Sequence, residues 1–110
     1  MVKLTILCGE PSNPTAFEEQ YARHVTDYIE HGDIPGLVRF DAAKALAAPT
    51  GKPPFYRTAD LWFESLDALQ AARGLERWQA GIKDLTSFSD GGLQVLVCTV
   101  DIKELVPAPG

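Results

Sequence analysis

Residues 54–69, with the sequence PFYRTADLWFESLDAL, contain a strand that passes directly into a helix. The strand shows the period of two that is typical of a sheet with two unlike faces. One face carries Tyr56, Thr58, Asp60 and Trp62, and the other carries Arg57, Ala59, Leu61 and Phe63. The Ser65 hydroxyl can accept from the free N–H groups of a following helical turn. We therefore predict a helix that begins at Ser65 and carries Leu66 and Leu69 inward.

The segment before this unit predicts a strand and a helix. Residues 2–8 alternate in the same way, and residues 9–14 are rich in turn formers. Asn13 can cap a helix that has Pro14 at its first position. Apolar and aromatic residues then recur at steps of three and four, which places them on one helical face. They are Phe17, Tyr21, His24, Val25 and Tyr28. Gly32 is expected to end this helix.

The remaining segments complete a six-element order. Pro35 and Gly36 lead into a strand over 37–43, and the proline-rich residues 47–54 form a loop. The helix from Ser65 is interrupted near Gly74 and continues an apolar stripe to about residue 88. A last strand covers 93–100. The order β-α-β-β-α-β predicts an α+β, ferredoxin-like fold, with a four-stranded antiparallel sheet and two helices on one face. We expect one domain over 1–103 and a flexible tail over 104–110.

The sheet face opposite the helices has no cover within the chain. The sequence places both polar and large apolar side chains on it: Lys3, Thr5, Leu7, Arg39, Asp41, Tyr56, Thr58, Asp60 and Trp62. An uncovered face that carries groups such as Trp62 and Leu7 usually finds a partner. Since twofold dimers are the commonest assemblies, we predict a homodimer through this face.

Composition excludes several functional classes. The chain has 110 residues and a formal net charge of −5, with no basic cluster, so no nucleic-acid partner is expected. No stretch approaches the roughly 20 apolar residues that span a bilayer. The N-terminal stretch is too short for a signal peptide, which favours the cytoplasm. Cys8 and Cys98 have no metal-ligand spacing, and antiparallel pairing of their strands keeps them apart. No phosphate-binding or dinucleotide-binding motif is present, and we expect no cofactor and no metal.

Several motifs, in this order along the chain, resemble those of the EthD-like family of the dimeric α+β barrel superfamily. They are residues 3–9 (KLTILCG), the aromatic helix that leads to His24, residues 34–37 (IPGL), 61–66 (LWFESL) and 88–92 (FSDGG). The resemblance implies a bacterial protein with a dimeric barrel. The family takes its name from an ether-degradation gene cluster, in which its member is an accessory protein. The superfamily includes cofactor-free monooxygenases, isomerases and cyclases, so the resemblance implies the fold more narrowly than the chemistry.

His24 is the candidate catalytic residue, because it is the histidine on the apolar helical face and can carry a proton near neutral pH. In the superfamily, the ligand cavity often lies between the helices and the sheet, where this face points. Many relatives follow the histidine with x-Pro-Leu, whereas Val25, Thr26 and Asp27 follow here, which lets the helix run on toward Glu30. A buried structural histidine is the alternative interpretation.

The candidate ligand-binding residues are aromatic side chains around His24 and beneath the helices. They are Tyr21, Tyr28, Phe40, Phe63, Trp78 and Phe88. Packing in the core is the alternative for each of them. Arg57 also points under the helices and needs a carboxylate or an anion there, unless it lies exposed at the strand end.

Two functions stay open. In the first, the protein binds a small organic molecule and acts as an isomerase, cyclase or monooxygenase with His24 as acid and base. In the second, it is an accessory or ligand-carrier protein of a degradation pathway, with no catalysis.

Overall fold

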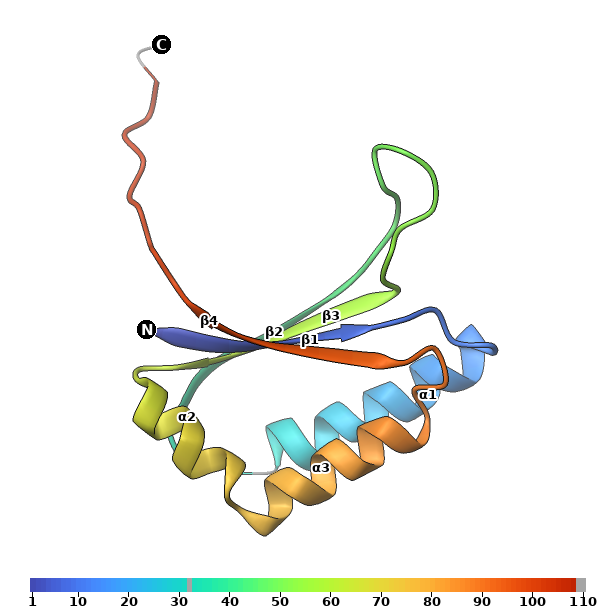
Figure 1. Cartoon of the computed structure of the whole chain (residues 1–110), viewed down its shortest axis with the longest axis horizontal. Coiled ribbons are helices and arrows are strands. Elements are labelled where there is room, and N and C mark those ends of the chain that lie inside the picture. Colours follow the sequence, from blue (N-terminus) through green and yellow to red (C-terminus); the bar gives the residue numbers. More distant parts are fainter. Residues whose placement is uncertain (32, 109–110) are drawn as a thin grey trace.

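One antiparallel sheet with all helices on one side forms the body of the protein (Figure 1). The computed structural model describes residues 1–31 and 33–108. The strand order in the sheet is β2-β3-β1-β4, so β1 and β3 are central, as expected for a ferredoxin-like fold. The elements are β1 (Val2–Cys8), α1 (Pro14–His24), η1 (Val25–Glu30), β2 (Leu37–Lys44), β3 (Arg57–Phe63), α2 (Leu66–Arg73), α3 (Glu76–Ser87) and β4 (Leu93–Thr99).

The predicted caps hold the starts of two helices. The Asn13 side chain accepts from the N–H of Ala16 at 3.1 Å, and Pro14 is the first residue of α1. The Ser65 hydroxyl accepts from the N–H of Ala68 at 3.1 Å and caps α2. Each bond satisfies a helical donor that would otherwise be free. The chain turns at Gly74, as predicted, and the second helical region is therefore two helices, α2 and α3.

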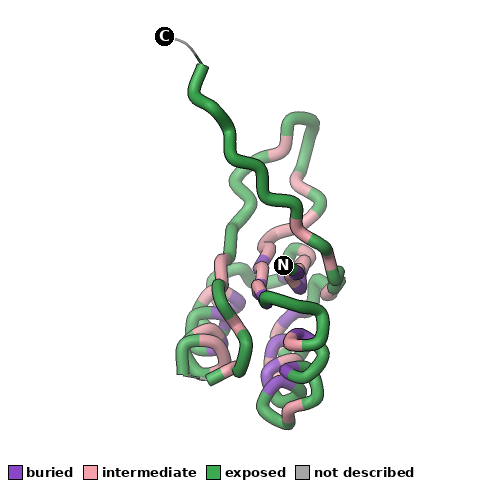
Figure 2. Tube along the Cα trace, turned by 90° about the vertical axis from the view of Figure 1, so that its left-hand side faces the viewer, coloured by how far each residue is buried: buried purple, intermediate pink, exposed green. Residues whose placement is uncertain are grey.

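The core lies between the sheet and the helices, where the buried segments in Figure 2 gather. Leu4, Phe63 and Leu69 are its largest fully buried side chains. The prediction that Leu66 also points inward is wrong, because its side chain is 48% exposed. Leu66 is the first residue of α2, and burial on this helix begins one turn later with Leu69 and Ala72.

Two irregularities change which side chains share a face. Tyr56 was expected on the open face, but its ring packs edge-on against Phe17 of α1 at 5.5 Å. The alternation begins only at Arg57, where β3 starts, so Tyr56 belongs to the loop. A bulge between Leu37 and Arg39 also breaks the expected alternation of β2, since it leaves Val38 as an extra residue that is 48% exposed.

The other predicted open-face residues keep their register. Trp62 pairs with Lys3 on one side and Arg39 on the other, and Asp60 pairs with Thr5 and Asp41. These side chains form one network, in which the Trp62 Nε1–H donates to Asp41 at 3.0 Å. The open face is therefore polar at its centre, with Trp62 held between two cations, Lys3 at 5.0 Å and Arg39 at 5.1 Å.

The first helical region continues to Glu30, as predicted, but its last six residues are a π-helix, η1. The predicted helix end at Gly32 lies outside the described residues. The cysteines are free, and the register pairs Cys8 with Leu93 and Cys98 with Lys3, which keeps them at opposite ends of the strand pair. Among the described residues, no helix is long and apolar enough to cross a membrane.

Candidate functional site

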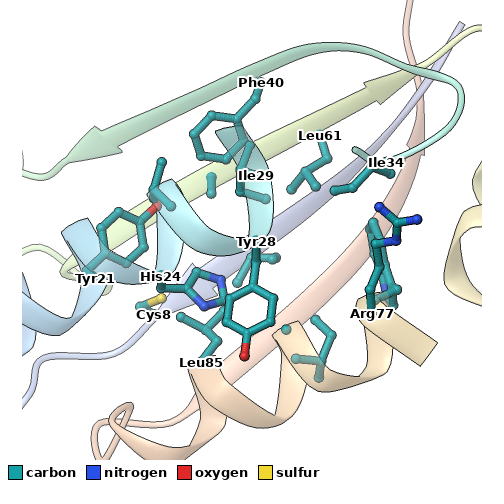
Figure 3. A pocket seen from close by; sticks show the side chains of 16 residues that line it. Cys8, Tyr21, His24, Tyr28, Ile29, Ile34, Phe40, Leu61, Arg77 and Leu85 are labelled. Atoms are coloured by element: carbon teal, nitrogen blue, oxygen red, sulfur yellow. The ribbon is translucent and has the colours of Figure 1, made fainter. Parts of the chain in front are cut away.

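A small cavity lies between α1, η1 and α3 on one side and the sheet on the other (Figure 3). Its volume is about 40 Å³, and most of its lining is apolar. Five of the aromatic and histidine residues singled out in the sequence line it: Tyr21, His24, Tyr28, Phe40 and Trp78. Helix α1 and η1 supply the first three, β2 supplies Phe40 and α3 supplies Trp78.

His24 is the main titratable group that faces this cavity. Its side chain is buried, and its Nδ1 lies 2.8 Å from Oδ2 of Asp84 on α3. Because an ionised carboxylate only accepts, the Nδ1–H donates to it. Nε2 then carries the free lone pair, and it has no hydrogen-bond partner among residues 1–31 and 33–108. The arrangement makes Nε2 a proton acceptor at the wall of an apolar cavity.

Three aromatic rings lie close to the imidazole of His24. The ring centroids of Tyr28, Phe88 and Tyr21 lie 5.2, 6.0 and 6.4 Å from that of His24. Figure 3 shows the Tyr28 ring directly beside the imidazole. Gly81 of α3 makes room for this ring, since a Cβ at Gly81 would lie 3.3 Å from Tyr28 Cδ1. These rings help to bury the imidazole, and His24 is only 8% exposed.

Two further polar groups line the cavity and stay neutral. Burial raises the pKa of Tyr21 to about 12, so its hydroxyl remains a donor at neutral pH. Burial also raises the pKa of the Cys8 thiol, against a smaller opposite effect of Arg57. A protonated thiol is a poor nucleophile, so the geometry favours His24 over Cys8 for proton chemistry.

Arg57 has a carboxylate partner, Glu18, as expected if its side chain points under the helices. Its Nε and Nη2 donate to the two oxygens of Glu18 at 2.9 and 3.1 Å. The guanidinium also lies over the ring of Tyr21, 4.6 Å from its centroid. This bidentate pair holds α1 against the start of β3 and so fixes the position of Tyr21.

Two of the predicted ligand-binding residues do not line this cavity. Phe63 has no exposed surface and packs against Trp78 in the core, with ring centroids 6.3 Å apart. The ring of Phe88 lies edge-on to His24, with centroids 6.0 Å apart, and lines a separate, open hollow near the start of α1. The spacing of apolar residues correctly predicted that Phe63 and Phe88 lie between the helices and the sheet. It does not show how far the cavity extends along the sheet.

Helix α3 adds Asp84 and Arg77 to the site, and neither residue was predicted from the sequence. Asp84 lies one position before the apolar Leu85, at the border of the buried stripe of α3. A carboxylate at such a border is the signal that could have identified a partner for His24. Arg77 lines the end of the cavity near Ile34, and its Nη1 donates to the carbonyl of Asp33 at 2.9 Å.

No group of three or more His, Cys, Asp and Glu side chains in the described part of the chain could hold a metal ion. The side chains of the site can transfer protons and form hydrogen bonds.

No protein-family model matches this chain. A curated relative, an uncharacterized 11.0 kDa protein from the thcB-thcC intergenic region of Rhodococcus erythropolis, is 30% identical over 96 residues. The match covers 87% of this chain and 91% of that protein. An EthD family protein from Bacillus halodurans C-125 has a similar structure, with a TM-score of 0.82 and 26% identity. That match covers 92% of this chain and 99% of the other.

More distant structures share the fold. SnoaB, a cofactor-independent oxygenase from Streptomyces nogalater, matches with a TM-score of 0.64 and 15% identity, over 93% of each chain. Dimeric ferredoxin-like proteins of unknown function from Thermobifida fusca, Jannaschia sp. and Bacteroides fragilis also match.

The fold and these matches define the class as the ferredoxin-like proteins of the dimeric α+β barrel superfamily. Within it, the chain belongs to the EthD-like family, as the sequence motifs predicted.

Proposed function

We propose that the protein binds a small, largely apolar organic molecule in the cavity beside His24 and that His24 transfers a proton on it. The observation that carries the proposal is the hydrogen bond from His24 to Asp84 at the wall of an apolar cavity. A histidine that is oriented by a carboxylate and has its second nitrogen free is a common general base.

The proton transfer would proceed as follows. Nε2 of His24 takes a proton from a carbon next to a carbonyl group, the C–H electron pair moves toward the carbonyl oxygen, and Asp84 stabilises the imidazolium. The Tyr21 hydroxyl stays protonated and can donate to the developing oxyanion. Return of the proton to another carbon gives an isomerisation. Attack of the carbanion on a second carbonyl of the same molecule gives a cyclisation, and its reaction with molecular oxygen, as a second substrate, gives an oxygenation.

The size of the cavity limits the ligand. At about 40 Å³ it is far smaller than typical ligand pockets, which measure about 300–1,000 Å³. A ligand with more than a few heavy atoms must therefore displace side chains. Tyr28 and Ile29 are the best placed to move, because both lie on the short π-helix η1 and are only partly buried. Short π-helical turns are frequent at functional sites.

The second candidate is a non-catalytic ligand carrier that uses the same cavity. The predominance of apolar side chains in the lining favours it, since they offer a ligand little besides burial. The two candidates differ in whether His24 exchanges a proton with the ligand.

The test uses His24→Gln, which keeps a similar size and a hydrogen-bond donor but cannot take up a proton. Small ketones, lactones and phenols are first screened by ligand-observed NMR, and ketones that bind are then followed for deuterium uptake from D₂O. We expect His24→Gln to bind the same compounds and to exchange at least about 100-fold more slowly, a typical contribution of a general base.

The matched control is His31→Gln, an exposed histidine at the end of η1, which should behave like the native protein. Binding without exchange in the native protein would favour the carrier. Equal exchange in His24→Gln and the native protein would refute a role of His24.

We also propose that the protein is a cytoplasmic homodimer that buries the open sheet face. The dimeric relatives support this assembly, as does Trp62 at the centre of that face. The description of its relative from B. halodurans as an ethyl tert-butyl ether family protein makes small branched ethers and their oxidation products a natural part of the ligand screen. A bacterial ether-degradation pathway is the corresponding context.

A further inference from the structure

Two segments leave the body of the protein on the side of the open sheet face. The loop between β2 and β3, residues 45–56, rises from one end of the sheet, and the tail after β4, residues 100–108, rises from the other. Figures 1 and 2, viewed 90° apart, both show them on the side opposite the helices. We name them the loop arm and the C-terminal arm.

Both arms expose large apolar side chains. Ile102, Leu105 and Val106 of the C-terminal arm are 70, 89 and 91% exposed, and Leu46 of the loop arm is almost fully exposed. The arms also make the chain less compact than its length requires. Its radius of gyration is 15.6 Å, compared with roughly 13 Å for a compact domain of this size.

We propose that the two arms clasp a second copy of this chain, which occupies the open sheet face between them. The inference rests on the proposed homodimer and adds the segments that hold it together. Exposed aliphatic side chains destabilise an arm in water and stabilise one that lies against a partner. The loop arm contains Pro49, Pro53 and Pro54, which stiffen it as a fixed support.

The C-terminal arm is long enough for this role. Nine extended residues reach about 30 Å, whereas two face-to-face sheets lie about 10 Å apart. The arm can therefore pass the interface and lie along an edge strand of the partner. The edge strands offer half-exposed apolar side chains for this contact: Leu96 of β4, which pairs with Thr5 of the open face, and the bulge residue Val38 of β2.

The charges of the open face also favour a second copy over another partner. In a twofold dimer, the same patch meets itself, so the patch must carry both signs of charge. Lys3 and Arg39 balance Asp41 and Asp60 within one network around Trp62. An unrelated partner would need no such balance, whereas a copy rotated by 180° can match each cation with an anion.

The first test measures self-association of the native protein and of a variant with Ile102→Ser, Leu105→Ser and Val106→Ser by analytical ultracentrifugation. These side chains are exposed, so the fold of each copy should persist, which circular dichroism can check. We expect at least a 100-fold larger dimer dissociation constant. The control Leu66→Ser removes an exposed leucine on the helical side and should leave the constant unchanged.

The second test follows tryptic cleavage after Lys103, which lies in the C-terminal arm, as a function of protein concentration. Lys52 in the loop arm precedes Pro53 and is a poor site for this protease. We expect cleavage after Lys103 to slow at least tenfold above the dissociation constant. A native protein that stays monomeric would refute both the dimer and the clasp. If the protein is a dimer, but the arm substitutions do not change its dissociation constant and cleavage after Lys103 does not slow with concentration, only the clasp is refuted.

Discussion

His24 and Asp84, which are separated by 60 residues in the sequence, lie 2.8 Å apart between Nδ1 and Oδ2 and connect α1 to α3. The bond determines which nitrogen carries the hydrogen, and it leaves Nε2 to the cavity. A buried histidine with a purely structural role usually has hydrogen-bond partners for its ring nitrogens, but this one presents a free lone pair beside an apolar space.

Replacement of Asp84 with alanine should change the tautomer of His24. Without the carboxylate acceptor, the Nδ1–H tautomer is no longer stabilised, and the neutral imidazole shifts toward the Nε2–H tautomer. Long-range ¹H–¹⁵N spectra of the imidazole distinguish the two forms directly. Because Asp84 is partly exposed, we expect a loss of only about 1 kcal/mol in the free energy of unfolding.

Asp84→Asn is the companion variant. Its amide oxygen can still accept from Nδ1, so the tautomer should be kept while the negative charge is lost. If Asp84→Ala shows the same tautomer as the native protein, the carboxylate does not orient His24.

The fold followed from the sequence because the period of two and the helical steps are set by the backbone. Residues 2–8 and 57–63 alternate without a break, and the burial of β1 matches that pattern residue by residue. The errors fall where local geometry interrupts the period. The bulge at Val38 and the late start of β3 after Tyr56 depend on contacts with other strands, which the sequence of either segment does not show.

The residues that line the cavity of the candidate site could be predicted in part for the same reason. The face of α1 and η1 placed Tyr21, His24 and Tyr28 together, since one helix determines their spacing. Asp84 could not be found in this way, because its approach to His24 depends on how α3 packs against α1. Phe63 shows the opposite error. It lies on the predicted, helix-covered face of β3, but it is buried in the core away from the cavity.

Gly81→Ala should stabilise the protein less than Gly74→Ala. Alanine is favoured over glycine by up to about 1 kcal/mol inside a helix, as at Gly81, and by about 0.4–1 kcal/mol at a turn whose backbone it can adopt, as at Gly74 with φ −78°. At Gly74 a Cβ meets its nearest atom at 3.5 Å, which is ordinary contact, but at Gly81 it presses on the ring of Tyr28 at 3.3 Å. Thermal melts of both variants measure the difference. Gly81→Ala should also alter ligand affinity, because Tyr28 must move; an equal gain at both sites would show that the ring yields freely.

The ion pair between Glu18 and Arg57 should make stability depend on pH. The hydrogen bonds from Arg57 lower the pKa of Glu18, so the folded state holds its proton less tightly than the unfolded state. The contribution of this ion pair to the free energy of unfolding is therefore complete above the ordinary glutamate pKa of about 4.3. It is lost as the pH falls through the lower pKa that Glu18 has in the folded state.

Urea unfolding of Glu18→Gln should show a loss of about 1 kcal/mol at pH 7, after allowance for partial exposure of the pair, and a smaller difference from the native protein at pH 3. Glu19→Gln is the control, since Glu19 is exposed and has no ion pair in the described part of the chain. A pH-independent loss in Glu18→Gln would show that packing, not charge, is responsible.

Trp62→Lys should convert the proposed dimer to a monomer. The new ammonium group would lie between Lys3 and Arg39, which both contact the Trp62 ring, and three cations would meet in a buried interface. Aspartate is a weaker test at this position, because the same two cations would neutralise it. Light scattering at tens of micromolar measures the mass, and a lysine variant that stays dimeric would place the interface elsewhere.

Cys8 and Cys98 should both be free thiols, with Cys8 much the slower to react in the folded protein. Cys98 pairs with Lys3 and Cys8 with Leu93, so five residues of strand, roughly 16 Å, separate them, whereas a disulfide needs Cα atoms about 4.4–6.8 Å apart. Burial both shields the Cys8 thiol and raises its pKa, which lowers the amount of reactive thiolate. Without reductant, the unfolded chain should therefore take up two equivalents of iodoacetamide, as measured by mass spectrometry. In the folded protein, peptide mapping should show that Cys8 is still unmodified at times when Cys8 of the unfolded chain has reacted completely. Rapid modification of native Cys8 would mean that the cavity beside His24 opens readily to solutes of this size.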